Sequence, residues 1–318
     1  MNAPHHLGLA LVRSIFRRPS KVFATGAIAA PSRRWQTPAP YTIATATDRP
    51  ETFTGTPQLG TSETNALPDA EATRGTRSHV DFLRDIHALL SPRFYLEIGV
   101  RHGASLALAT GHALGVDPAP EISVPLSNQV EVLAATSDDF FAGSADELLS
   151  KPIDLAFIDG MHWFEFALRD FINIERRAHA ATVIVFDDVF PVHRLQAERN
   201  RQTRVWTGDV WKIITCLRRV RPDLLLIPFD TFPTGMLLVA GLNPDSHQLA
   251  DQYDAIVREL VDNDSGAVPD DVLERSGAWA ADDSRIAKLL GTLRQHRDAD
   301  SPTAVSLALD AWRTEHSR

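Results

Sequence analysis

The pattern of apolar and polar positions becomes regular only from about residue 77 onward. Apolar residues there recur three and four positions apart, a spacing that places them on one face of an α-helix. We therefore expect the folded part of the chain to begin near Arg77 with an amphipathic helix. The apolar positions of this helix are Val80, Leu83, Ile86, Leu89 and Leu90.

Beyond this helix, short apolar runs alternate with amphipathic stretches, which is typical of a parallel sheet with helices on both faces. The last two runs are separated by a short, turn-rich segment that predicts an antiparallel hairpin. The sequence thus predicts a Rossmann-like α/β fold with a mainly parallel seven-stranded sheet. The predicted strands are Phe94–Ile98, Leu114–Val116, Val130–Ala134, Leu155–Ile158, Val183–Phe186, Leu224–Pro228 and Met236–Val239, and the clearest helices are Phe164–Arg177 and Val210–Val220.

Two extensions flank this α/β domain, which we place at residues 76–244. Residues 31–72 are rich in Pro, Thr, Ser and Ala, so they cannot bury enough apolar surface to offset the entropy lost on ordering. We therefore expect residues 1–75 to be a largely disordered N-terminal extension. Residues 245–318 carry two apolar stripes at helical spacing, which predict a helical C-terminal extension.

Composition and charge exclude several classes of function. The net charge of -9 argues against non-specific binding of nucleic acid, which requires a basic surface. No run approaches the roughly 18 consecutive apolar residues of a membrane span. Acidic residues are absent before Asp48 whereas arginines are frequent, which fits a basic tail on a cytoplasmic protein better than a mitochondrial transit peptide. The single cysteine, Cys216, excludes an intramolecular disulfide and is more simply a core residue than a nucleophile.

The strongest local signal for chemistry lies at the end of the first predicted strand of the sheet. This strand carries Glu97, and Gly99 and Gly103 follow it, which allows a sharp turn and a close approach of the next helix to a ligand. A dinucleotide fingerprint needs a glycine at position 101, where this chain has Arg101, so the pattern disfavours NAD. S-adenosylmethionine (SAM) fits better, because Glu97 can face its cationic methionine part while Ser105 and the loop amides hold its carboxylate.

The next two strands supply candidate contacts to the nucleoside part of the same cofactor. Asp117 ends the second strand, where a carboxylate can accept hydrogen bonds from both ribose hydroxyls. Ser137 and Asp138 follow the third strand, where short polar side chains can meet the adenine edge. The order and spacing of these residues favour SAM as the cofactor, although each residue alone is a weak signal.

Three carboxylates are expected at the ends of the fourth and fifth strands, namely Asp159, Asp187 and Asp188. Acids that lie so close together repel and raise one another's pKa, and a divalent cation with oxygen ligands relieves this repulsion. We therefore predict a Mg²⁺ site formed by these three residues, with Asp159 also placed to act in catalysis. His162 follows Asp159 closely and is the candidate general base for a substrate hydroxyl. The competing interpretation is that these residues only cap helices or form turns.

A long segment, residues 191–212, follows the fifth strand and is rich in arginine. Long loops at the ligand end of a sheet commonly bind or cover a substrate. Trp206 is a candidate for stacking on an acceptor, whereas Trp211 is better explained as a core residue. The arginines fit equally well a solvated loop and a site for an acidic or phosphorylated acceptor.

These motifs resemble those of a known family. Residues 94–240, and in particular Ile-Asp-Gly-Met-His, Phe-Asp-Asp-Val and the stretch from Trp206 to Lys212, are similar to class I SAM-dependent O-methyltransferases, notably the bacterial enzymes that methylate macrolide sugars. The resemblance implies SAM as cofactor, a metal held by Asp159, Asp187 and Asp188, and His162 as base. The antiparallel hairpin at the end of the sheet agrees with this family rather than with dehydrogenases.

We therefore expect metal-assisted O-methylation of a small hydroxylated acceptor, with no nucleic-acid or membrane partner. Helical tails in such enzymes often lie between subunits, so a homo-oligomer is compatible with the sequence. Two alternatives remain at this point, a SAM-binding module without turnover and a nucleotide-dependent oxidoreductase.

Overall fold

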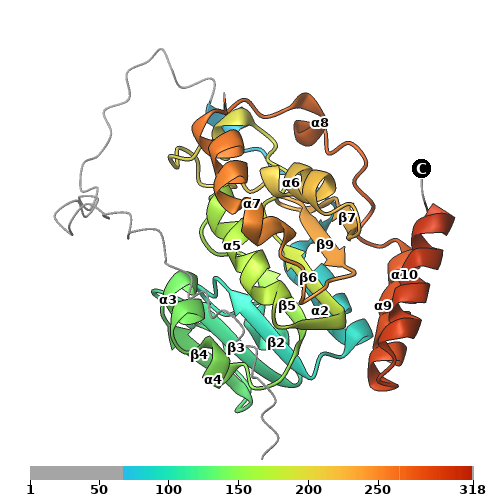
Figure 1. Cartoon of the computed structure of the whole chain (residues 1–318). Coiled ribbons are helices and arrows are strands. Elements are labelled where there is room, and N and C mark those ends of the chain that lie inside the picture. The colour runs from blue at the N-terminus through green and yellow to red at the C-terminus, as the bar shows by residue number, and fades with distance from the viewer. Residues whose placement is uncertain (1–66, 265, 317–318) are drawn as a thin grey trace, which may run out of the picture. The chain divides into compact units, whose positions relative to one another are not determined.

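The computed structural model describes residues 67–264 and 266–316, which form an α/β domain around a seven-stranded sheet (Figure 1). The strand order is β4-β3-β2-β5-β6-β9-β7, and β9 runs antiparallel to both of its neighbours while the other pairs are parallel. The mainly parallel sheet with an antiparallel hairpin at one end is therefore confirmed. The strands of this sheet are β2 (Phe94–Ile98), β3 (His112–Asp117), β4 (Val130–Ala134), β5 (Ile153–Ile158), β6 (Ala178–Phe186), β7 (Leu225–Phe229) and β9 (Met236–Ala240).

Alternate residues of each strand face opposite sides of the sheet, and each side is covered by its own helices. Leu96, Ile98 and Ala156 point to the side of α3, α5, α6 and α7, whereas Tyr95 and Leu155 point to the side of α2, α9 and α10 (Figure 1). Both sides are apolar, as parallel strands buried on two faces require. The helices are α1 (Leu67–Ala70), α2 (His79–Leu90), α3 (Ser137–Ala142), α4 (Ala145–Leu148), α5 (Phe164–Glu175), α6 (Lys212–Val220), α7 (Gln248–Val257), α8 (Asp270–Leu273), α9 (Ser284–Asp298) and α10 (Pro302–His316), with shorter or wider turns at η1 (Leu106–Leu108), η2 (Arg194–Ala197) and η3 (Arg258–Asp262).

The C-terminal helices are part of the core rather than an appendage. Leu290 and Leu293 of α9 and Leu309 and Trp312 of α10 are buried together with residues of β2, β5 and β6. In this region the connection between β2 and β3 contains only the three-residue turn η1, and no helix lies between β3 and β4. The helices α9 and α10 therefore cover part of a sheet face that the short β2–β3 and β3–β4 connections leave open.

Residues 67–75, which the composition assigns to the N-terminal extension, contact the α/β domain. Ala70 is fully buried, and the Gln196 amide donates hydrogen bonds to the carbonyl oxygens of Ala70 and Ala72 at 2.9 and 2.8 Å. Glu71 accepts hydrogen bonds from the backbone amides of Arg204 and Val205. A short strand pair, β1 (Arg77–Ser78) with β8 (Thr231–Phe232), follows. The domain thus begins before residue 76, and the predicted disorder of residues 1–66 falls outside the described residues.

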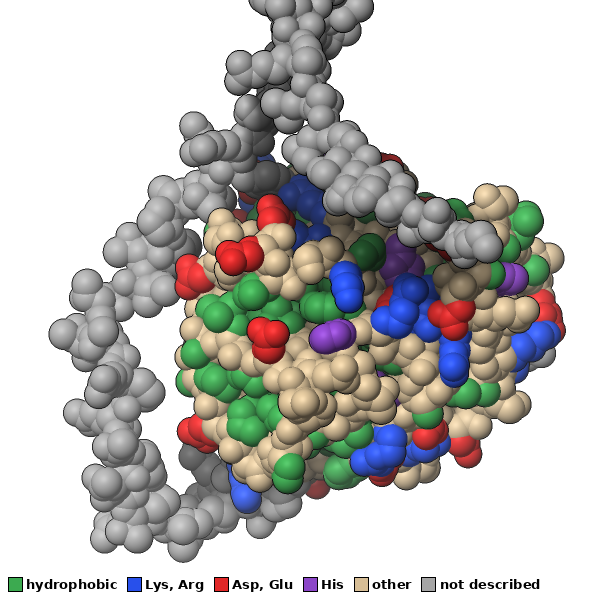
Figure 2. Space-filling view, turned by 90° about the horizontal axis from the view of Figure 1, so that it is seen from below, with side chains coloured by type: hydrophobic (Ala, Val, Ile, Leu, Met, Phe, Trp, Pro, Cys, Tyr) green, Lys and Arg blue, Asp and Glu red, His purple; other side chains and the backbone are tan. Residues whose placement is uncertain are grey.

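A buried ionic cluster joins the strands at the end of the sheet opposite their carboxyl ends. Asp154 of β5 is 1% exposed and accepts hydrogen bonds from the Arg93 amide at 2.6 Å and from His179 Nε2 at 2.8 Å. Burial opposes ionisation of Asp154, but the hydrogen bonds from His179 and Arg93 outweigh burial and hold its pKa well below the ordinary value. Figure 2 shows the molecule from below, and on this face basic and acidic side chains lie beside one another.

We predict that Asp154→Asn lowers the free energy of unfolding by about 3–5 kcal/mol, because it leaves a buried cluster of donors without its anion. A carboxyl whose folded pKa is depressed contributes stability above its unfolded pKa, and this stability is lost as the pH falls. The difference between wild type and variant should therefore be complete at pH 7 and shrink below about pH 4 in urea titrations. Asp146→Asn is the control, because Asp146 pairs with Arg177 while 90% exposed. An equal effect of both substitutions would contradict the prediction.

Within the described ranges, no helix is both long and apolar enough to cross a membrane. Cys216 is buried in α6, as expected for a core residue.

Candidate active site

The site predicted from the sequence lies at the carboxyl ends of β2, β3, β5 and β6, where open α/β sheets bind ligands. These four strands are neighbours in the sheet, so residues far apart in the sequence come together at one edge. Asp159 directly follows β5, and Asp187 and Asp188 directly follow β6. The β5–β6 register pairs Ile158 with Phe186, which brings the three acids to the same level.

The glycine loop after β2 requires backbone that other residues rarely adopt. Gly99 has φ 86°, and a Cβ at this position would lie 1.9 Å from the carbonyl oxygen of Asp159. Gly103 has φ 80° and lies close to the side chain of Ile122. Gly99 therefore allows the sharp turn that the sequence predicts, whereas the predicted approach of Gly103 to a ligand stays a prediction. The helix expected after Gly103 is reduced to the short turn η1.

Glu97 is fully buried at the base of this loop. Its two carboxylate oxygens accept hydrogen bonds from the Ser105 hydroxyl at 2.6 Å and from the Tyr95 hydroxyl at 2.6 Å. Burial raises the pKa of Glu97 to about 7, although both hydroxyls favour the ionised form. A cation brought beside Glu97 would favour that form further. The sequence did not lead us to predict Tyr95 as a partner of Glu97. Its position two residues before Glu97 places both side chains on the same face of the strand, which could have indicated the contact.

Asp117, at the end of β3, holds the glycine loop in place. One oxygen accepts the amides of Val100 and Arg101 at 2.9 and 2.8 Å, and the other accepts the Ala119 amide at 2.7 Å. A carboxylate has about four acceptor positions, so these bonds leave roughly one for an outside hydroxyl. Asp117 therefore has a structural role, and its contact with the ribose stays a prediction.

The residues predicted to meet adenine are directed toward α5. Asp138 accepts two hydrogen bonds from the Arg169 guanidinium, at 2.8 and 2.6 Å, in a bidentate pair. The Ser137 hydroxyl interacts with Asp170, whose pKa burial raises to about 7. Both side chains thus have protein partners, and a contact of this loop with a base stays a prediction.

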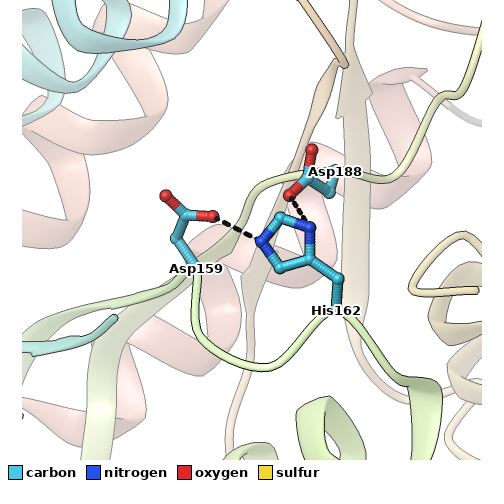
Figure 3. A group of neighbouring side chains, drawn as sticks. All are labelled: Asp159, His162 and Asp188. Atoms are coloured by element: carbon cyan, nitrogen blue, oxygen red, sulfur yellow. Dashed lines mark ion pairs between the residues drawn. The ribbon is translucent and has the colours of Figure 1, made fainter. Parts of the chain in front are cut away.

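Asp159, His162 and Asp188 form a compact group (Figure 3). Each offers one ligand atom, and these atoms lie within 4.8 Å of one another. Asp187 is less available, because its Oδ1 accepts the Asp188 amide at 2.9 Å and the Thr234 hydroxyl at 3.3 Å. The structure thus brings together two of the three predicted ligands with the predicted base, and it places Asp187 behind them.

The contacts of His162 define which ring nitrogen is free. Its Nδ1 lies 2.7 Å from the carbonyl oxygen of Trp206 and 3.1 Å from Oδ2 of Asp188 (Figure 3). A carbonyl oxygen only accepts hydrogen bonds, so Nδ1 carries the proton in the neutral ring. The lone pair is then on Nε2, which lies 3.7 Å from Asp159 Oδ1. The Trp206 ring stacks on the imidazole, with centroids 4.9 Å apart, and fixes its plane.

Two of the three acids, Asp159 and Asp188, have raised pKa values. Burial raises the pKa of the Asp159 carboxyl well above its ordinary value, and the charges of Asp187 and Asp188 raise it further. Burial also raises the pKa of Asp188 to about 6, which the nearby His162 partly opposes. Asp188 has φ 63°, a left-handed conformation that costs a non-glycine residue about 1–3 kcal/mol and clusters at functional sites.

The donor set fits a divalent cation. Two carboxylates converge with an imidazole, and the carboxylate of Asp187 accepts a hydrogen bond from the Asp188 amide beside this group. Their mutual repulsion is relieved by a bound positive charge, and oxygen-rich sets suit Mg²⁺ or Mn²⁺.

The arginines of residues 191–212 include two that pair with acidic side chains of the protein itself. Arg194 pairs with Asp270, while Arg199 pairs with Glu165 and Asp209. These arginines join the loop to α8 and α5 and pair within it, which weakens the interpretation as an anion site. Trp211 is buried, as expected, whereas Trp206 contacts His162. Sequence reasoning did not find Thr234, since an isolated threonine in a hairpin gives no signal.

Comparisons with known proteins agree with this fold. A family model described as a methyltransferase domain matches residues 96–189, from β2 to just beyond Asp188. A search of the curated proteins found no match.

Among solved structures, the chain is similar to the cofactor-bound protein Rv0187 from MTB, with 20% identity over 55% of this chain and 86% of that chain and a TM-score of 0.41. It is similar to the O-methyltransferase from Bacillus cereus in complex with SAH, with 18% identity over 56% and 87% of the two chains and a TM-score of 0.40. It is also similar to the MycE methyltransferase of the mycinamycin pathway, solved with Mg, SAH and mycinamycin VI, with 15% identity over 52% and 50% and a TM-score of 0.38.

The family match covers the glycine loop and all three acids, and the sheet has the antiparallel end expected for the resemblance. Residues 96–189 are therefore similar to a methyltransferase domain.

Proposed function

We propose that the protein catalyses divalent-cation-assisted O-methylation of a small hydroxylated acceptor. The observation that carries this proposal is the group formed by Asp159, His162 and Asp188 beside the glycine loop. A module that only holds SAM needs no such group. The close approach of the Gly99 backbone to Asp159 supports a cofactor loop beside the acids, which suits transfer between two bound molecules.

In this proposal SAM lies across the ends of β2 and β3. Glu97 faces its cationic methionine part, which favours the ionised carboxylate over the protonated form near pH 7. Asp117 offers its remaining acceptor position to a ribose hydroxyl, while its bonds to Val100 and Arg101 keep the loop in shape. Gly103 leaves room for the cofactor, and Ser105 keeps Glu97 oriented. Ser137 and Asp138 remain candidates for the adenine end.

His162 removes the proton of the acceptor hydroxyl through Nε2. The methyl group of SAM is already activated, so the protein mainly aligns the two reactants and removes a proton. As His162 becomes cationic, its Nδ1–H stays between the Trp206 carbonyl and Asp188, and the Asp188 charge stabilises the imidazolium. In this proposal Asp188 therefore both orients the base His162 and binds the cation.

Asp159 and Asp188 would hold the cation, with Asp187 behind them. When bound, such an ion lowers the pKa of a coordinated hydroxyl and orients it. The apolar side chain of Met161, 42% exposed between Asp159 and His162, gives the acceptor site an apolar edge. This combination suits a hydroxylated molecule with an apolar part.

The two alternatives are less well supported. A nucleotide-dependent oxidoreductase needs a glycine where Arg101 lies, and Arg101 fills that position with φ 45°. Calorimetric titration with SAM and with NAD separates these classes, since only SAM should bind. Binding of NAD alone would exclude the proposal. Binding of SAM and Mg²⁺ without turnover on any member of a panel of catechols and sugars would leave the module as the better description.

We predict that Asp188→Asn weakens Mg²⁺ binding by about 10–100-fold, because it removes a ligand charge and the partner of His162. SAM affinity should stay within about twofold, since Asp188 is not among the residues assigned to SAM. Isothermal calorimetry with each ligand measures both effects, and Asp251→Asn on the exposed surface of α7 is the matched control. Unchanged Mg²⁺ affinity in Asp188→Asn would exclude the proposed cation site.

A further inference from the structure

Arg275 is a buried cation that comes from the C-terminal segment, far outside the matched residues 96–189. Its side chain is 2% exposed and pairs with Asp230 at 2.6 Å. Burying a guanidinium costs free energy unless its donors are used, so the remaining contacts show what the residue does. Its backbone is left-handed, with φ 57°, at the end of the turn after α8.

The guanidinium of Arg275 joins two segments that meet next to the acids. It donates to the carbonyl oxygens of Thr231 at 2.8 Å and Pro233 at 2.6 Å, in the link between β7 and β9. It also lies 3.4 Å from the carbonyl oxygen of Phe190, which follows β6 shortly after Asp188. A planar fork with fixed donors can hold several acceptors in one arrangement, which an ammonium cannot do.

The segments held by Arg275 lead directly to the acids through Thr234. The Phe190 amide donates to the carbonyl oxygen of Thr234 at 2.7 Å, so the two segments are also bonded to each other. The Thr234 hydroxyl donates to Asp187 at 3.3 Å and also interacts with Asp188. The chain of contacts therefore runs from Arg275 through Pro233 and Thr234 to the two acids.

The packing around this link leaves little freedom. Gly235 has φ 69°, and a Cβ there would lie 2.4 Å from the Phe190 ring. The Arg275 guanidinium lies 6.0 Å from the centre of the same ring. A shift of the β7–β9 link would therefore move Thr234 relative to Asp187, because the Phe190 ring lies directly against Gly235.

We propose that Arg275 is a positioning residue, which sets the geometry of Asp187 and Asp188 for a divalent cation by fixing the link that carries Thr234. This inference rests on the cation site of the proposed function. It assigns part of the active-site architecture to the C-terminal segment, which contributes no residue to the acidic group itself.

The test is Arg275→Lys in the full-length protein, which keeps the charge but removes the fork. We expect the affinity for Mn²⁺, measured by electron paramagnetic resonance, to fall by about 10–100-fold, as for other residues that orient metal ligands. SAM affinity by calorimetry should change by less than about twofold. Arg221→Lys is the matched control, because Arg221 is fully buried between Glu175 and Asp223 at the end of α6. It should lose stability in thermal unfolding but keep its Mn²⁺ affinity.

Thr234→Val is the second variant and covers the case in which Arg275→Lys does not fold. It preserves the shape of the side chain but removes the hydroxyl, and it should also weaken Mn²⁺ binding while leaving SAM binding intact. Wild-type Mn²⁺ affinity in the folded variants would overturn the positioning role and leave the cation site standing. A wild-type protein that binds SAM but no Mn²⁺ would overturn the cation site and this inference together.

Discussion

His162→Ala is expected to lower the rate of methyl transfer by about 10²–10⁴-fold, the range that a general base contributes. The reason is that no other group is oriented as His162 Nε2 is, with Nδ1 held by Trp206 and Asp188. Turnover measured with radiolabelled SAM, on the best acceptor from the panel of catechols and sugars, gives the rate. SAM affinity should remain within about twofold, because the imidazole is assigned no contact with the cofactor.

His193→Ala is the control for this experiment. His193 is also half-buried, and its ring accepts the Leu195 amide at 3.2 Å, so its loss removes a local cap without touching the acids. It should keep wild-type turnover. If His162→Ala unfolds at a much lower temperature than His193→Ala, or if both retain full activity, the role of His162 is structural and the assignment as base fails.

Gly99→Ala is expected to abolish tight SAM binding. Its φ of 86° disfavours any side chain by about 1–3 kcal/mol, and the new Cβ would lie 1.9 Å from the Asp159 carbonyl oxygen. The loop must then move away from β5, and a cost of 1.4 kcal/mol already corresponds to about a tenfold loss of affinity. Calorimetry should therefore show SAM binding weakened by well over tenfold.

Gly277→Ala separates the cost of a left-handed backbone from the cost of the contact with Asp159. Gly277 has a similar φ of 78°, but a Cβ there meets nothing within 4 Å. This variant should lose about 1 kcal/mol of stability in urea unfolding and keep its SAM affinity. A Gly99→Ala protein with SAM affinity equal to that of Gly277→Ala would show that the contact with Asp159 is unimportant for the cofactor site.

The sheet could be predicted from the sequence because its signals are local. The strand β2 was predicted with its observed bounds, since Phe94–Ile98 is a short apolar run between turn signals. The acids Asp159 and Asp188 were expected to meet because parallel strands end at the same edge. The steric role of Gly99 followed from the need for a sharp turn after a strand.

The contacts of several predicted site residues, and the start of the domain, depend on partners that are distant in the sequence. Asp138 was expected to face the cofactor, yet Arg169 of α5 binds it, and no local pattern indicates that pairing. Asp187 was expected to be an equal metal ligand, but Thr234 and the backbone take up one of its oxygens. The boundary near residue 76 rests on composition. Composition cannot indicate that the Gln196 side chain donates hydrogen bonds to the carbonyl oxygens of Ala70 and Ala72.

The position of α9 and α10 also determines when the protein can become compact during its synthesis. The apolar residues buried together with these helices include residues of β2, β5 and β6, which emerge from the ribosome long before Ser284. Until residues 284–316 have emerged, that face of the sheet stays open to water and to other nascent chains. Proteins dominated by such long-range contacts fold slowly and expose aggregation-prone surface meanwhile. Closing the domain with its last two helices is therefore expected to delay the burial of this apolar surface until synthesis is almost complete.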